Sequence, residues 1–197
     1  MINLHSLFIT PVFSINLLGY EDLIKVIKEI QQKDPKGIKK TNEGGWHSQT
    51  DLHCDERFST LKSEFINLGQ EVMAHLSIEE YMIPELSGLW AMVNSPGSRN
   101  KLHSHPFNYL SGVFYLQVPP KSGALVFHDP RPQSEVLSPP KKNDESIHTS
   151  SRVAWTPKTN DLIFFPSWIN HEVEKNNSNE ERIILSFNLE LKRRMNA

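Results

Sequence analysis

Hydrophobic residues recur along this chain at two spacings, and the spacing changes near residue 77. Over 20–33, apolar residues recur at helical spacing with Lys and Glu between them, and a following proline and glycine end the pattern, so we predict a helix. A second helix is predicted over 59–76, with Ser59 as its N-cap. Its apolar residues form one stripe: Leu61, Phe65, Leu68, Val72 and Leu76. Both helices therefore need an apolar surface to cover.

That surface is predicted from about residue 77 onward, where the spacing of apolar residues becomes two. Five segments there have the pattern of strands: 109–118, 123–129, 161–166, 171–175 and 182–191. Short strands separated by turn residues are typical of a sandwich or jelly roll. Residues 7–17 mix β-branched and aromatic residues with a proline, which favours an edge strand. We expect one domain over 1–197, mainly β, with a core over about 77–191 and an N-terminal strand and helices over 7–76.

The segment between two of these strands, 129–152, is rich in proline and longer than a passive connection within a domain usually is. Two interpretations stay open for it. It is either a disordered segment or a functional lid over a site.

Composition narrows the function classes. The hydrophobic fraction of 38% is high enough for a folded core, and 21 basic against 23 acidic residues, a net charge of −2, lack the basic excess of a general nucleic-acid binder. Cys54 is the only cysteine, so a metal must be held by His, Asp or Glu. The N-terminus does not read as a signal peptide, and no apolar run reaches the roughly 18–20 residues of a membrane span. We expect a cytoplasmic protein with no membrane association; the sequence does not predict its oligomeric state.

Three histidines form a candidate metal site. His103 and His105 are two residues apart, so in an extended backbone both imidazoles project to the same side. His171 opens another predicted strand, which a jelly roll can bring beside the first pair. Three ligands on one face of an octahedron leave three positions open for exogenous ligands. The competing interpretation is that an HxH pair arises by chance, since single histidines are usually surface or satisfied core residues.

A candidate anion site follows on the last predicted strand. Arg182, Ile184 and Ser186 share one face of that strand and point inward or outward together. Inward, Arg182 needs an anion, and Arg182 with Ser186 forms a socket for a carboxylate. Outward, Arg182 faces water and pairs with an adjacent glutamate, Glu180 or Glu181. The four tryptophans are expected in the core rather than at a site: Trp46, Trp90, Trp155 and Trp168.

The segments that carry these residues resemble the iron(II)- and 2-oxoglutarate-dependent oxygenases, in particular a bacterial and phage branch of that superfamily. The matching segments are HSHPFNYLSGVFYL (103–116), GALVFHDPR (123–131), DLIFFPSWINHEV (161–173) and ERIILSFN (181–188), with NEGGWHS (42–48) and the 90–94 stretch. Each motif is weak alone, and their order and spacing together are specific. The resemblance implies a double-stranded β-helix, a cupin-like jelly roll, with helices that buttress its major sheet.

By position, the resemblance implies His103 as the first iron ligand and His171 as the distal one. It implies Arg182 and Ser186 as the clamp for the far carboxylate of 2-oxoglutarate, with Tyr115 as a hydrogen-bond donor to the same group. The sequence departs from the wider family at His105, which stands where most members have an aspartate. Either His105 is the third ligand or Asp129 supplies a carboxylate from a neighbouring strand. We favour His105, because it stands at the matching position.

The resemblance thus implies a hydroxylase whose cofactors are Fe(II) and 2-oxoglutarate, with dioxygen as the oxidant and an unknown substrate. Two alternatives stay open. One is a three-histidine dioxygenase of the cupin kind that does not use 2-oxoglutarate. The other is a jelly-roll module without catalysis, which binds a sugar or a protein or serves as a structural component.

Overall fold

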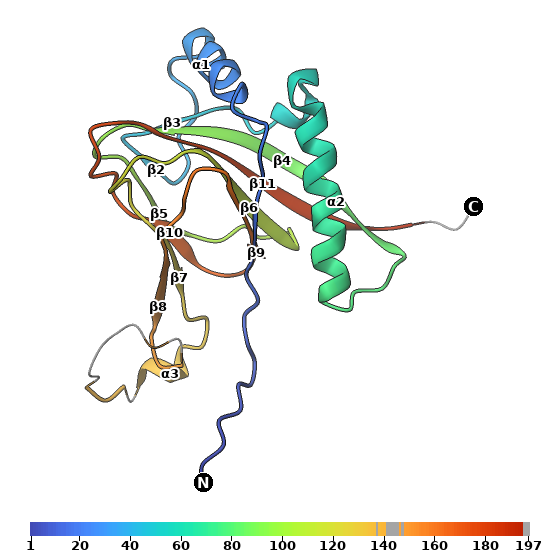
Figure 1. The fold of residues 1–197 in the computed structure, drawn as a ribbon, viewed down its shortest axis with the longest axis vertical. Helices are drawn as coiled ribbons and strands as arrows, with labels where there is room; N and C mark the ends of the chain where they lie inside the picture. The colour runs from blue at the N-terminus through green and yellow to red at the C-terminus, as the bar shows by residue number, and fades with distance from the viewer. Residues whose placement is uncertain (137, 141–145, 147, 195–197) are drawn as a thin grey trace.

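Two antiparallel β-sheets, one of six strands and one of five, make up most of the structure (Figure 1). The computed structural model describes residues 1–136, 138–140, 146 and 148–194. The six-stranded sheet has the order β1-β9-β6-β11-β4-β3. Its strands are β1 (Phe13–Asn16), β9 (Asp161–Pro166), β6 (Leu110–Gln117), β11 (Arg182–Arg193), β4 (Met82–Asn94) and β3 (Trp46–His47). We call it the major sheet.

The five-stranded sheet, the minor sheet, has the order β2-β5-β10-β7-β8. Its strands are β2 (Asn42–Glu43), β5 (Arg99–His103), β10 (His171–Val173), β7 (Leu125–His128) and β8 (Arg152–Trp155). After β4, the chain passes back and forth between the two sheets. Strands β5, β7, β8 and β10 lie in the minor sheet, and β6, β9 and β11 lie in the major sheet. The predicted jelly roll is therefore confirmed.

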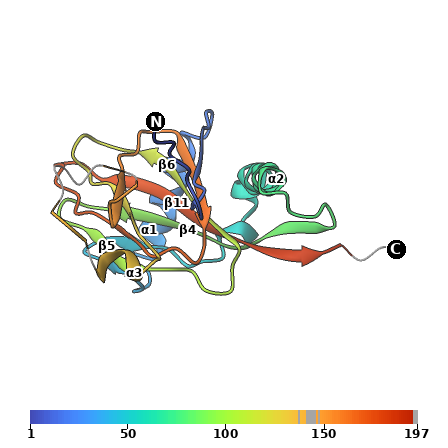
Figure 2. The same cartoon turned by 90° about the horizontal axis from the view of Figure 1, so that it is seen from below.

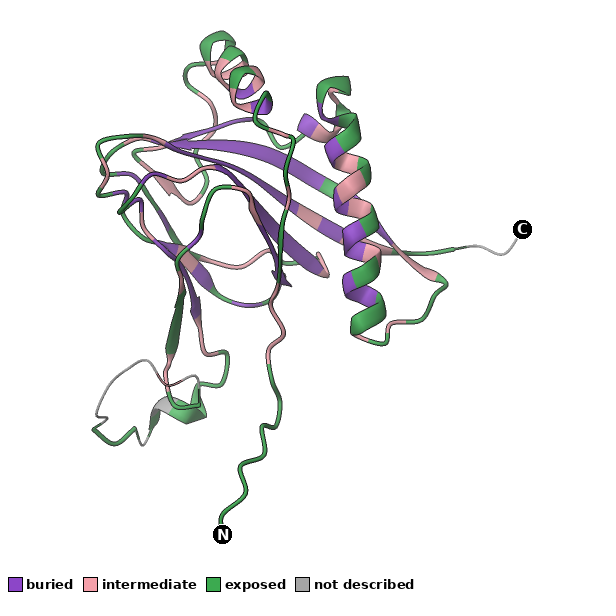
Figure 3. Cartoon of the chain, viewed as in Figure 1, coloured by how far each residue is buried: buried purple, intermediate pink, exposed green. Residues whose placement is uncertain are grey.

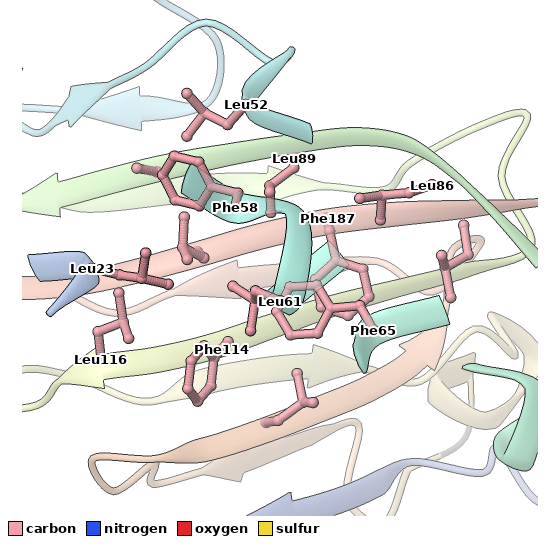
Figure 4. Packing of buried hydrophobic residues seen from close by; sticks show 14 of the residues in the cluster. Leu23, Leu52, Phe58, Leu61, Phe65, Leu86, Leu89, Phe114, Leu116 and Phe187 are labelled. Carbon is pink, nitrogen blue, oxygen red and sulfur yellow. The ribbon is translucent and has the colours of Figure 1, made fainter. Parts of the chain in front are cut away.

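Two helices cover the outer face of the major sheet, as their apolar stripes predict. They are α1 (Leu23–Lys33) and α2 (Ser59–His75). Two short 3₁₀ helices, η1 (Leu52–Cys54) and η2 (Glu56–Phe58), precede α2. A second view shows α2 on one side of β4 and β11, whose ends project past the other strands (Figure 2). Phe65 of α2 stacks on Phe187 of β11 with ring centroids 4.1 Å apart (Figure 4). None of the described helices is long and apolar enough to cross a membrane.

The long strands of the major sheet are buried over much of their length (Figure 3). Their buried residues form two layers, one on each face of the sheet. The outer layer lies between that sheet and the helices. The inner layer lies between the two sheets and consists of Trp90, Met92, Val113, Tyr115, Leu125, Phe127, Ile163, Phe165, Ile169, Val173 and Ile184. Alternate residues of β11 belong to alternate layers, so Arg182, Ile184 and Ser186 share the inner face.

The structure corrects several local predictions. Ser59 is the first residue of α2 rather than its cap, because η2 runs directly into the helix and the cap position falls on Phe58, which offers no polar side chain. The spacing of apolar residues does not predict the long strand β4, because Pro84 interrupts its pattern. Pro84 is tolerated because it lies where β4 pairs with β11 alone.

The 103–105 pair is predicted to lie in one extended segment, but only His103 belongs to a strand. His103 is the last residue of a strand, β5, and the next strand begins only at Leu110.

Part of the 129–152 segment forms a short helix, α3 (Gln133–Val136), and the strand β8 begins at Arg152. Residues 137, 141–145 and 147 lie outside the described residues, so neither interpretation of this segment as a whole is tested.

Candidate metal and cosubstrate site

Register pairing brings His103 and His171 together. They are direct cross-strand partners on β5 and β10, and their ring centroids lie 4.3 Å apart. His105 follows β5, and its backbone N–H donates to the carbonyl of Ser167 over 2.9 Å, which holds it beside the turn that leads into β10. One nitrogen from each of the three rings lies within 4.8 Å of the others. The structure thus gathers the three histidines that the sequence singled out.

Hydrogen bonds fix which nitrogen two of these rings present to the shared space. The Nδ1 of His103 lies 2.6 Å from the carbonyl oxygen of Lys101, and the Nδ1 of His171 lies 3.0 Å from that of Ile169. A carbonyl can only accept, so Nδ1 carries the proton and donates in both rings. The Nε2 lone pair is then available to a metal, an arrangement that is common for metal-bound histidines.

Burial keeps the three imidazoles neutral. Desolvation lowers the pKa of His105 to about 4 and that of His171 to about 3, with a further lowering from His103 in both cases. The pKa of His103 is also lowered by burial. A metal binds the deprotonated imidazole, so the cluster is in the metal-binding form at neutral pH.

Asp129, the alternative carboxylate ligand, is engaged elsewhere. Its oxygens accept from the backbone and side chain of Arg131 and from the hydroxyl of Ser134, at 2.9 Å in each case. These bonds lower the pKa of Asp129 to about 2, with Arg131 as the main cause. Asp129 is not among the residues that cluster with His103 and His171. It stabilises the turn after β7 instead.

Arg182 lies in the interior, with none of its surface exposed. Its Nη1 donates to the carbonyl of Ser122 and, over 3.4 Å, to that of Gly123. Its Nε and Nη2 are buried without a partner among the described residues, and neither neighbouring glutamate pairs with it. A buried guanidinium with two unpaired N–H groups is costly unless an anion satisfies it.

Tyr115 is the second buried polar group here without a partner. It is 1% exposed, and its hydroxyl has no hydrogen-bond partner among the described residues. Burial raises the pKa of Tyr115 well above its usual value, an effect that the nearby positive charge of Arg182 partly opposes. The hydroxyl therefore stays protonated and can donate. Tyr115 and Arg182 are close enough for their charges to interact, and both have unused donors among the described residues.

A cavity of about 290 Å³ runs from the histidines into the space between the sheets. All three histidines line it, and so does Ser186, whose hydroxyl has no partner among the described residues. Ile184 lines it as well, and Arg182 lies two residues before Ile184 on the same face of β11. Further lining comes from Lys40, Thr41, Thr50, Trp90, Met92, Asn100, Ser104, Gly112, Val113, Leu125, Phe165 and Val173.

Trp90 belongs to the inner layer, as the sequence predicts, and also to this site. It is 8% exposed and lines the cavity, with its ring centroid 5.7 Å from that of His105. On its other side, His47 stacks nearly parallel to it at 5.8 Å. The available signal was the period-two pattern of β4, which places Trp90 and Met92 on one face. Only the register between β4 and β11, which pairs Trp90 with Ser186, places that face at the site.

The comparisons with known proteins identify the class. Residues 88–188, just over half of the chain, match the family model described as "Putative 2OG-Fe(II) oxygenase". The chain belongs to this family of iron(II)- and 2-oxoglutarate-dependent oxygenases, and its cofactors are iron(II) and 2-oxoglutarate. No curated protein gives a significant match.

Solved structures with the same fold include several oxygenases. A Pseudomonas putida prolyl-4-hydroxylase superimposes with a TM-score of 0.62 at 15% identity, covering 95% of this chain and 94% of that one. The carbocyclase SnoK from nogalamycin biosynthesis gives 0.64 at 12% identity, covering 91% and 79%. HygX from Streptomyces hygroscopicus, solved with nickel, 2-oxoglutarate and hygromycin B, gives 0.60 at 11% identity, covering 92% and 83%. At these identities the likeness establishes the double-stranded β-helix fold.

The residues present fit both cofactors. Three neutral imidazoles with converging nitrogens suit a divalent transition metal. The unpaired donors of Arg182 and Tyr115 suit a buried carboxylate, since charge-assisted hydrogen bonds to one would satisfy both groups.

Proposed function

We propose that this chain is a hydroxylase in which His103, His105 and His171 hold iron(II), and in which Arg182, Tyr115 and Ser186 bind the distal carboxylate of 2-oxoglutarate. The observation that carries the proposal is that a metal-binding cluster and an anion-binding group lie together between the two sheets. A neutral three-histidine cluster lines one part of the cavity, and a buried guanidinium without an anionic partner lies beyond it. The unpaired guanidinium favours 2-oxoglutarate use over a cupin-type dioxygenase that binds its substrate directly.

The cofactors supply the chemistry: 2-oxoglutarate is oxidised by dioxygen to succinate and carbon dioxide, and the second oxygen atom converts a substrate C–H bond into C–OH. The chain's own residues bind and orient. Val173 and Leu125 are lining residues on the minor sheet that lie on the Gly123 side of His171 and Phe127, toward the carbonyls that Arg182 contacts. They therefore line the stretch from the metal ligands to the anion socket with apolar side chains, which excludes water from the reacting groups.

The test is a turnover assay with anaerobically prepared, iron-loaded protein. We expect the protein to release succinate from 2-oxoglutarate in a reaction that requires iron and oxygen. Slow succinate release should be seen even without a substrate, because 2-oxoglutarate can be oxidised without hydroxylation. His75→Ala, on the exposed end of α2, is the matched control, because it removes a histidine far from the cluster. Iron binding without any succinate release by the wild-type protein would instead support the cupin-type alternative.

A further inference from the structure

The rim of the cavity carries positive charge and no acidic residue. The lining residues that are exposed or half-buried include Lys40, Thr41, Thr50 and Ser104, which form the rim, and no Asp or Glu is among the described lining residues. The three metal ligands are neutral, so they cancel none of the charge of a divalent ion. The positive charges of the ion, Arg182 and Lys40 together exceed the negative charge of bound 2-oxoglutarate, so positive charge remains uncompensated. Such a cavity attracts a further anion.

Lys40 has no acidic partner in the described part of the chain. The one acidic residue of the 38–50 segment, Glu43, pairs with Arg99 at 2.5 Å and with Lys101 at 3.0 Å. No ion pair to Lys40 is present among the described residues. Burial is the main cause of the lowered pKa of His47, and the positive charge of Lys40 lowers it further. The charge of Lys40 therefore acts on the buried residues near the cavity. Lys40 thus presents a free ammonium group to the rim.

The backbone around Lys40 is held in place. Its N–H donates to the side-chain oxygen of Asn42 over 2.8 Å, and Asn42 in turn donates to the carbonyl of Gly45 over 2.8 Å. Asn42 also pairs with Asn100 across β2 and β5, which ties the segment to the minor sheet. The rim is therefore anchored to the strand that ends in His103.

Thr41 supplies a second donor at the same rim. The buried side chain of Asn94 donates to Asn100 over 3.4 Å, and Asn100 donates to the hydroxyl of Thr41 over 3.2 Å. The hydroxyl is thus already an acceptor, and its own hydrogen has no acceptor among the described residues. Asn100 and Thr41 both line the cavity. The chain of donors ends in a group that is free to bind an oxyanion.

We propose that Lys40 and Thr41 form an oxyanion subsite at the cavity rim, which binds a carboxylate or phosphate group of the substrate. This rests on the proposed function, because it places the anionic end of the substrate at the rim and its reacting carbon at the metal. An ammonium group and a hydroxyl donor together suit either oxyanion. The substrate class is therefore a small molecule or side chain with a negatively charged end.

The experiment uses the full chain loaded with cobalt(II) and saturated with 2-oxoglutarate. Inorganic phosphate is titrated in, and the relaxation of its ³¹P signal is measured; ¹³C-labelled acetate is titrated in parallel. The zinc-loaded protein is the diamagnetic reference. We expect at least one of the two anions to relax faster near cobalt, while the visible spectrum of cobalt stays unchanged because the anion does not coordinate the metal. Phosphate alone, or acetate alone, identifies which oxyanion the subsite takes.

Variants separate the subsite from general charge. We expect Lys40→Gln to weaken binding of that anion about tenfold or more, with cobalt and 2-oxoglutarate binding unchanged. Lys39→Gln removes the adjacent exposed lysine, which does not line the cavity, and should bind as the wild type does. Thr41→Val should weaken binding and Thr41→Ser should retain it.

Three results would overturn the subsite: no anion binding to the loaded wild-type protein, equal binding by Lys40→Gln and wild type, or equal weakening in the two lysine variants. Failure of the wild type to bind cobalt and 2-oxoglutarate would overturn the proposed function, and the subsite with it.

Discussion

His103 and His171 are opposite each other on neighbouring antiparallel strands, and each donates its Nδ1 proton to a backbone carbonyl two residues earlier in the chain. The two rings therefore present Nε2 to the same space without help from a metal. Preorganisation of this kind lowers the cost of metal binding, because the ligands need little rearrangement.

We predict that His103→Ala or His171→Ala abolishes tight binding of a divalent metal. Loss of a direct ligand should cost more than the roughly 10–100-fold that follows from loss of an outer hydrogen-bond partner. Titration calorimetry with cobalt(II) measures this, with His75→Ala as the control. Metal affinity that is unchanged in both cluster variants would contradict the assignment.

The choice between His105 and Asp129 has its own test. His105→Ala should lose iron, because His105 lies in the cluster, whereas Asp129→Ala should keep it, because Asp129 is bound to Arg131 and Ser134. Iron content after anaerobic loading is the measurement. The reverse result, with iron retained by His105→Ala and lost by Asp129→Ala, would replace the three-histidine set with a carboxylate ligand.

Cosubstrate binding should depend on the two buried donors. We expect Arg182→Met to weaken 2-oxoglutarate binding by at least about 30-fold, because a buried anion would lose its charged partner. Tyr115→Phe should cost less, roughly 5–10-fold, since it removes one neutral donor. Metal binding should be unaffected in both. Arg193→Met, on the exposed end of β11, is the control; a clamp variant with the affinity of this control would refute its role.

The metal-free protein should lose stability as the pH falls below about 6.5. The folded-state pKa values of His105 and His171 are lowered to about 4 and about 3, so between these values and the unfolded value the unfolded chain binds more protons. Each residue should contribute about 1–2 kcal/mol of lost stability between pH 6.5 and 4.5. Urea unfolding across this range measures the slope, which His171→Gln should reduce. A slope that is the same in the variant would argue against a buried neutral His171.

Gly112 should tolerate no side chain. A Cβ on Gly112 would lie 2.1 Å from the ring of Phe187, which is itself stacked on Phe65. Gly112→Ala should therefore destabilise the fold by about 1–3 kcal/mol through overpacking. Gly88→Ala is the matched control, because its Cβ would have no neighbour closer than 3.6 Å. Equal stability of the two variants would show that the ring moves aside without cost.

The sequence by itself determined the elements whose pattern depends on near neighbours. The helical stripe of α2 and the alternation in β6, β9 and β11 are visible in the chain because side-chain direction repeats every 3.6 or 2 residues. The same local rule placed Arg182 with Ser186 on one face of β11, whereas His103 and His105 do not share a strand, because β5 ends at His103. It misplaced the cap at Ser59 and missed β4, where the pattern is broken locally by a residue that the tertiary structure tolerates.

Only the tertiary structure decided which faces meet. Strand register places His171 opposite His103, and the stacking of the two sheets turns Arg182 away from water and its neighbouring glutamates. It also brings Trp90 of the major sheet to His105, which follows β5 of the minor sheet. These relationships depend on pairings between segments that are distant in sequence, and alternation along one strand is the same whichever strand lies opposite it.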